Sequence, residues 1–485
     1  MACNHFGIMV SLGKTFVAGV IWGTIEKFAS LFIGFIITVL LARKLTPADY
    51  GLVNMIHIFT VFGMVLIDGG FGQALIQKRD VSNKDYSTIF FLNILLSLAV
   101  FVALYYSAPF IAEFYRQPSL ISISRTLFLL FPINAFSIIQ HTLLTKQLKV
   151  KQLTLVSVVS SLISGFIGLY YAYSGYGVWA LVYQTLTLYI VRTFTLWIIN
   201  DWRPIIKFSF TSIKTIWNFS INLLGTFTLA SIFQNIYTVI IGRFFNVVDV
   251  GFYNQAFRFE SIATNTVTSA VQRVSFPAFA ELQNDMDRLR SAYKKVINVT
   301  MYLHLPIMLG IATIGHDLFL VLLTDKWLPS VPYFHLLCIA SSLYPMHMIN
   351  VNVIKALGKG QLYFRLNLLK YLLMTIFIIL TIRHSIIAVL LGYVIATISS
   401  CLFITYYCGK EIKYSIYSQF KELIPIFITT GVMVCLVLSC RFMDIQPTIR
   451  LFIEILIGIA SYVGLSYIFK LEVFTHLVNI VKKQS

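Results

Sequence analysis

Fourteen long apolar runs constrain this chain more than any other feature of its sequence. A membrane-spanning helix needs about 20 mostly apolar residues, because lipid offers no hydrogen-bond partner to an exposed backbone. Runs of that length lie at 16–42, 50–76, 86–113, 121–143, 153–174, 178–199, 216–243, 250–277, 293–323, 331–354, 362–382, 385–408, 422–441 and 449–469. The sequence therefore predicts an all-α integral membrane protein with about fourteen transmembrane helices. The first run is too long for the apolar segment of a signal peptide, so we expect it to remain as the first spanning helix.

Basic residues alternate from one connection to the next. Of the 37 lysines and arginines, 23 lie in every second connection, beginning with the N-terminal segment, and 8 lie in the others. A missed or invented helix would destroy this alternation, and basic residues favour the cytoplasmic side. We expect a multi-pass protein of a bacterial inner membrane with both termini in the cytoplasm. The net charge of +18 then points to lipid headgroups and topology and away from nucleic acid.

The chain contains an internal repeat at an offset of 200 residues. Positions 38–54 and 238–254 share six identities without a gap, and each copy joins two predicted helices at their outer ends. Six helices separate the copies, so both have the same orientation in the membrane. This pattern predicts two parallel-related six-helix bundles, residues 1–200 and 201–408, followed by two further helices and a cytoplasmic tail in 409–485.

The predicted helix at 250–277 carries a polar stripe along one face. Polar residues recur there every three to four positions, which a lipid-facing helix could not tolerate. Ionisable groups at membrane depth usually face a cavity. Facing basic groups suit an anionic, phosphate-bearing ligand. The residues expected to contact substrate in such a cavity are Lys27, Arg258, Arg273, Asn254 and Asn265.

Acidic groups within the spans are candidates for ion coupling. These are Glu26, Asp68 and Glu260, for which a buried salt bridge is the alternative role. Arg192 lies one to two turns from the cytoplasmic face, and the simpler expectation is that it extends to the membrane surface. We expect His57, His141, His304, His335 and His347 to be packing residues, because their spacing fits no metal site.

Two Arg–Asp pairs lie at the outer turns of the repeat. Arg43 and Asp49 in the first copy match Arg243 and Asp249 in the second. We expect each pair to hold its hairpin together. Neither a catalytic constellation nor a metal cluster is evident, so no cofactor is expected beyond coupling to H⁺ or Na⁺. The cysteines form no CxxC, which argues against a disulfide framework or a zinc site.

Several stretches resemble the polysaccharide transport family of the multidrug/oligosaccharidyl-lipid/polysaccharide (MOP) exporter superfamily. They are Leu41–Val53, Asp68–Lys78, Asp85–Asn93 and Gly251–Asn254. The resemblance is nearest to the Wzx-type lipopolysaccharide and colanic-acid exporters and covers nearly the whole chain. It implies a MATE-like fold and a flippase with an undecaprenyl-pyrophosphate-linked oligosaccharide as substrate. It also implies alternating access, a cationic central cavity, and polysaccharide polymerase or assembly proteins as partners.

Three alternatives remain open. A drug/cation antiporter of the same superfamily would have acidic residues dominating its cavity. A membrane glycosyltransferase or polysaccharide polymerase would carry a long outer loop, whereas the predicted outer loops are short. A structural scaffold for the assembly complex would leave the polar helix at 250–277 without a purpose.

Overall fold

The computed structural model describes residues 29, 31–475 and 478–479, and the described regular structure is helical. Residues 31–44 form the described part of the first expected helix. Lys27 and Glu26 lie outside the described residues. The chain packs as two compact units, the first ending at Gly251 and the second beginning at Phe252.

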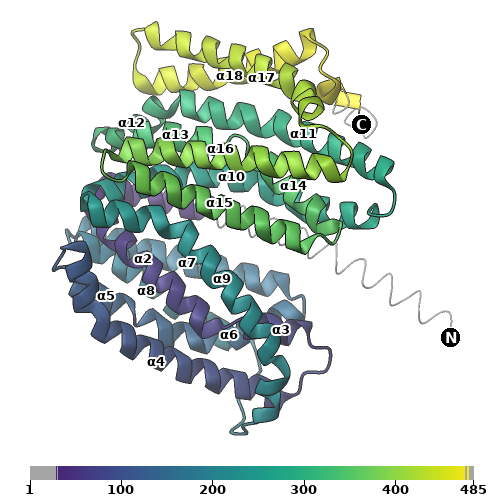
Figure 1. Ribbon diagram of the computed structural model, residues 1–485. Helices are drawn as coiled ribbons and strands as arrows, with labels where there is room; N and C mark the ends of the chain where they lie inside the picture. Colours follow the sequence, from purple (N-terminus) through teal and green to yellow (C-terminus); the bar gives the residue numbers. More distant parts are fainter. Residues whose placement is uncertain (1–28, 30, 476–477, 480–485) are drawn as a thin grey trace. The chain divides into compact units, whose positions relative to one another are not determined.

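Besides the helical residues 31–44, the described part of the first unit contains eight complete helices and the start of α10 (Figure 1). Its elements are α2 (Pro47–Asp68), α3 (Phe71–Gln77), α4 (Asn83–Tyr115), α5 (Leu120–Leu127), α6 (Leu130–Lys146), α7 (Val150–Tyr173), α8 (Val178–Ile199), α9 (Phe210–Phe244) and the first residues of α10 (Val247–Glu281). α9, which we expected in the second lobe, packs here against α2, α3 and α4. The lobe boundaries at 200 and 408 stay a prediction. They mark where the sequence repeat begins and ends, whereas the division at Gly251 marks where contacts within the structure are fewest.

The second unit holds the rest of α10 and the C-terminal helices. They are α11 (Met286–Thr313), α12 (Gly315–Leu323), η1 (Asp325–Ser330), α13 (Val331–Ser341), α14 (Tyr344–Ala356), α15 (Gly360–Thr381), α16 (Ile386–Glu411), α17 (Ile416–Ser439), η2 (Cys440–Phe442) and α18 (Pro447–Ile468). α17 and α18 lie side by side (yellow-green in Figure 1). Both contribute to one apolar core with α11, α14 and α16.

The membrane-spanning character is confirmed. Within the described residues, eleven helical stretches are long and apolar enough to cross a bilayer. α9 and α10, at 35 residues each, are the seventh and eighth expected runs. α10 is the polar one that the sequence singled out.

Four expected runs are each broken into two helices, where the sequence predicted uninterrupted ones. They become α2–α3, α5–α6, α11–α12 and α13–α14. At the first break Gly69 and Gly70 have φ of 53° and 74°. Residues with a side chain rarely adopt these left-handed backbone angles. Glycine adopts them readily, so it permits the chain to leave one helix and start the next. This break places Asp68 beside the start of α3.

Candidate functional site

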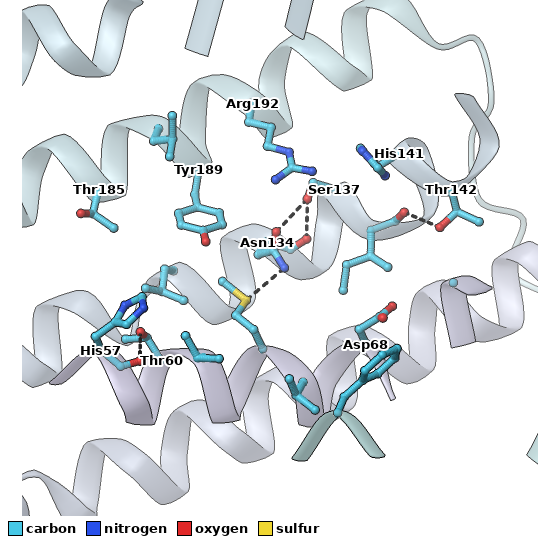
Figure 2. A pocket seen from close by; sticks show the side chains of 18 of the residues that line it. His57, Thr60, Asp68, Asn134, Ser137, His141, Thr142, Thr185, Tyr189 and Arg192 are labelled. Atoms are coloured by element: carbon cyan, nitrogen blue, oxygen red, sulfur yellow. Dashed lines mark hydrogen bonds between the residues drawn. The ribbon is translucent and has the colours of Figure 1, made fainter. Parts of the chain in front are cut away.

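A cavity of about 770 Å³ lies within the first unit. Its walls come from α2, α3, α6 and α8, with Leu127 of α5 and Phe227 of α9 also lining it. The volume is in the range of small-molecule sites, roughly 300–1,000 Å³. Figure 2 shows that side chains from α2, α6 and α8 converge on it. The cavity has a mixed lining, in which polar and ionisable side chains are set among apolar ones. Ionisable groups at membrane depth that face a cavity are typical of a ligand site in a membrane protein.

Ionisable side chains gather at one end of this cavity. In Figure 2 Arg192 of α8 lies near His141 of α6, and Asp68 at the end of α2 lies apart from both on the lower side of the cavity. Gly72 of α3 lets the side chains of Thr142 and Asp68 come close to its backbone. A Cβ at this position would lie 3.0 Å from Thr142 Oγ1 and 3.1 Å from Asp68 Oδ1. The lining of this end therefore includes a guanidinium, an imidazole and a carboxylate.

The lining residues at the other end of the cavity carry no carboxylate or guanidinium and are rich in hydroxyl groups, and we call this the neutral end. Tyr189 and Thr185 come from α8, and His57 and Thr60 from α2. Thr185 Oγ1 donates to the carbonyl of Leu181 at 2.9 Å, and Thr60 Oγ1 donates to that of His57 at 2.7 Å. A threonine hydroxyl that donates its hydrogen bond to a carbonyl of its own helix can still accept a hydrogen bond from a ligand. The neutral end thus offers acceptors and one aromatic face.

Asn134 and Ser137 connect the two ends. Ser137 Oγ lies 3.0 Å from Asn134 Oδ1, and Asn134 Nδ2 donates to the sulfur of Met64 at 3.1 Å. The first contact lies within α6, and the second joins α6 to α2 (Figure 2). A thioether is a weak acceptor, so the amide of Asn134 can exchange it for a better partner.

The wall between α6 and α8 is fixed by three hydrogen bonds on successive turns. Thr193 donates to the carbonyl of Ile133 at 3.1 Å, Trp197 Nε1 to that of Phe136 at 2.9 Å, and Asn200 Nδ2 to that of Gln140 at 3.2 Å. Side-chain-to-backbone bonds between membrane helices are each worth about 0.6–2 kcal/mol. We name this set the α6–α8 ladder. An apolar groove of about 400 Å³, lined by Phe136, Phe194 and Trp197 among others, lies on the same two helices.

The basic and amide residues predicted on α10 do not line this cavity. Arg258, Asn265 and Arg273 are exposed and Asn254 is half-buried. Their contact with substrate stays a prediction, and Lys27 lies outside the described residues. Among the described residues that the sequence proposed for substrate binding or ion coupling, Asp68 lines this cavity.

Glu260 is enclosed in the second unit, with 3% of its surface exposed. Thr264 Oγ1 donates to its carboxylate at 2.6 Å, and the hydroxyl of Ser341 also bonds to it. Asp68, by contrast, faces a cavity. An ion-coupling role for Glu260, Asp68 or Glu26 stays a prediction.

The outer-turn residues have local roles that the sequence did not specify. Asp49 and Thr46 form a capping box at the start of α2, with Thr46 N donating to the Asp49 carboxylate at 2.9 Å. The guanidinium of Arg243 lies 5.3 Å from the ring centre of Phe114. Asp249 N donates to Asn246 Oδ1 at 2.9 Å. The Arg43–Asp49 and Arg243–Asp249 ion pairs stay predictions.

Three cavity residues were not proposed for the site from the sequence. His57 and His141, expected as packing residues, line the cavity, and Arg192, expected to extend to the membrane surface, turns toward the cavity in Figure 2. The signal was present, because Thr185, Tyr189 and Arg192 recur every three to four residues, as do Asn134, Ser137 and His141. This is the same stripe rule that singled out α10. Among the described residues, no group of His, Cys, Asp and Glu could hold a metal ion.

Comparison with known proteins identifies the fold and the family. The family described as polysaccharide biosynthesis protein matches residues 40–332. The chain is 26% identical over 465 residues to the teichuronic acid biosynthesis protein TuaB of Bacillus subtilis, covering 94% of this chain and 96% of that protein. It is 22% identical over 422 residues to the lipopolysaccharide biosynthesis protein WzxC of Escherichia coli, covering 85% and 84%. The succinoglycan biosynthesis transport protein ExoT of Rhizobium meliloti is 25% identical over 351 residues, 72% of this chain and 71% of that one.

Two solved transporter structures share this fold. The lipid II flippase MurJ in an inward closed conformation superimposes with a TM-score of 0.74 at 18% identity, over 93% of this chain and 98% of that one. An inward-facing MATE multidrug transporter of the MOP superfamily gives 0.62 at 15% identity, over 79% and 94%. The chain therefore has the same fold as these two transporters. With more than half of its length matched, this multi-pass membrane chain belongs to the polysaccharide biosynthesis protein family.

Proposed function

We propose that this protein moves a polyprenyl-diphosphate-linked oligosaccharide across the bacterial inner membrane by alternating access. The observation that carries the proposal is the cavity in the first unit, which has an ionisable end and a hydroxyl-rich neutral end. A lipid-linked oligosaccharide has the same two parts, a charged diphosphate and neutral sugars.

The ionisable end suits the diphosphate. Arg192 supplies charge-assisted hydrogen bonds to phosphate oxygens, and His141 beside it supplies a further donor. The neutral end suits the sugars, because Tyr189 offers an aromatic face and Thr185, Thr60 and His57 offer hydrogen-bonding groups. We place the undecaprenyl tail in the surrounding lipid, as its length and apolarity require.

Relatives and topology support this assignment. The names of TuaB, ExoT and WzxC refer to the synthesis or transport of three different polysaccharides, and MurJ is named as a flippase of lipid II. The alternation of basic connections supports an inner-membrane protein with cytoplasmic termini. In that orientation Arg192 and Asp68 lie toward the cytoplasmic side, where the precursor is expected to bind. Polymerase or assembly proteins acting on the outer side would then be the functional partners.

The test measures transport by purified protein in liposomes that contain a fluorescent polyprenyl-diphosphate oligosaccharide. A charged hydrogen bond contributes about 1.5–3 kcal/mol, so Arg192→Gln is expected to slow translocation by about 10–100-fold. Arg203→Gln is the matched control. Arg203 sits outside the cavity, with its guanidinium bonded to the carbonyls of Asn200, Trp202 and Trp197. Equal rates for both variants would rule out the cavity as the phosphate site.

A drug/cation antiporter is the second candidate, because Asp68 gives the cavity an acidic group and the MATE fold is shared. The same liposomes, loaded with a cationic dye, separate the two functions. Dye efflux driven by a proton gradient, without movement of the lipid, would favour the antiporter.

A further inference from the structure

The two copies of the internal repeat touch each other through two glycines. A Cβ on Gly51 of α2 would lie 1.9 Å from the carbonyl oxygen of Val247, and a Cβ on Gly251 of α10 would lie 1.9 Å from that of Pro47. Positions 47 and 51 correspond to 247 and 251 at the repeat offset of 200. The contact is thus reciprocal, and all four residues belong to the first compact unit.

Both helix starts that make this contact are held by caps. Thr46 and Asp49 form the capping box of α2, and Asn246, which occupies the corresponding position before α10, accepts from Asp249 N. Each cap satisfies a backbone N–H of the first turn and so stabilises the start of its helix. Small residues let membrane helices approach until Cα–H groups meet carbonyl oxygens. Only glycine leaves room for this approach, because the opposing atoms are backbone and not a flexible side chain.

We propose that this paired glycine contact is the outer seal of the transport cycle, which closes the cavity toward the external side and parts when cargo leaves. The proposal rests on the proposed function and on the predicted topology, which places the starts of α2 and α10 on the outer side. Val53, half a turn beyond Gly51, already lines the cavity. Movement at the seal is therefore transmitted directly to the cavity wall along α2.

The test follows access to the cavity from outside. Every native cysteine except the fully buried Cys408 is replaced by serine. Val61→Cys then introduces one cysteine into the cavity lining. Right-side-out vesicles are treated with a membrane-impermeant maleimide. Gly51→Ala and Gly251→Ala are each expected to raise the labelling rate at position 61 by about ten-fold or more, because a methyl group cannot fit in the closed contact.

Controls distinguish opening from unfolding. Gly34→Ala and Gly225→Ala add the same methyl group where nothing lies within 4 Å, and they are expected to leave labelling unchanged. Cys408 labels only in unfolded protein. Equal labelling in the wild type and both alanine variants would overturn the proposal, and so would a response of one glycine without the other.

Val247→Ala provides a second route if the alanine variants do not accumulate. It removes the methyl group that lies 2.9 Å from the Cβ position of Gly51 and adds no atom. We expect a smaller rise in labelling, and no rise would overturn the proposal. Labelling needs no cargo, so failure of the lipid transport assay alone would reject the proposed function and leave the seal intact.

Discussion

Asp68 and Glu260 are acidic residues within spanning helices, but their surroundings differ. Glu260 is enclosed and bonded by neighbouring hydroxyl groups in the second unit. Asp68 lines the cavity that Arg192 and His141 also line, and in Figure 2 its carboxylate lies apart from both. A group that must exchange an ion with water during transport needs the second kind of environment.

Asp68→Asn is therefore expected to abolish the effect of an imposed proton or sodium gradient on transport, while passive exchange of the lipid continues. Glu260→Gln keeps the hydrogen bonds of an enclosed group and is expected to remain gradient-dependent. Rates in liposomes with and without each gradient provide the measurement. A gradient response that survives in Asp68→Asn would remove this residue from the coupling step.

The sequence showed which helices carry polar stripes but not which stripes meet. Composition and spacing were sufficient for α10, whose polar face is long. Arg192 and His141 lie on shorter stripes within otherwise apolar helices, and their convergence with Asp68 depends on the tertiary packing of α2, α6 and α8. His57 and His141 were expected as packing residues, and in the structure both line the cavity.

At the scale of helices, spans could be predicted from apolar length, because lipid requires backbone hydrogen bonds to be satisfied within each helix. Breaks within spans could not be predicted in the same way. Gly69–Gly70 was visible in the sequence, but glycine also occurs inside unbroken helices here, as at Gly63 of α2. Whether a glycine ends a helix or lies within it depends on the residues that pack around it in the folded protein.

The ion pair between Asp317 and Arg450 joins α12 to α18. Asp317 belongs to the expected run 293–323, but the stretch able to span the membrane ends at Thr313, so Asp317 lies beyond it. Arg450 binds its carboxylate through Nε and Nη2, the latter at 2.7 Å. Burial would raise the pKa of Asp317, but hydrogen bonds from Arg450 and His316 outweigh it and hold the pKa below the ordinary value. This stabilisation is complete above the pKa of unfolded aspartate, about 3.9, and is lost as the pH falls through the lower folded value.

Asp317→Asn is expected to reduce stability at pH 7 by about 3 kcal/mol, because a charge would be left without its partner. Thermal unfolding in detergent at pH 7 provides the measurement. Glu411→Gln breaks the more exposed pair with Lys359 and is expected to cost less than about 1 kcal/mol. Equal melting temperatures for the two variants would show that the Asp317 pair contributes little.

At the scale of the whole chain, α17 and α18 are more than an appendage. The sequence described them as two further helices, since the repeat ends before them. In the structure Tyr462 donates to the carbonyl of Tyr302 at 2.8 Å, and Lys294 binds Glu422 at 2.7 Å. Buried residues of both helices join the core of the second unit. Counting repeats could predict the number of these helices but not this dependence.

A chain that ends at Ile412 is therefore expected to accumulate several-fold less than the full chain, because the second unit loses part of its core. Immunoblots of membrane fractions provide the measurement. Co-expression of residues 413–485 as a separate polypeptide is expected to restore much of the level. Normal accumulation of the shortened chain would show that the second unit is stable without these helices.

The α6–α8 ladder has a consequence for the path of a lipid. A cargo whose tail stays among the acyl chains needs a slit in the protein wall, through which the tail and head remain connected while the head travels. Three successive hydrogen bonds stitch α8 to α6 along one side of the cavity. The slit must therefore open along another border of the cavity, and the lipid would travel past the α6–α8 seam without passing through it.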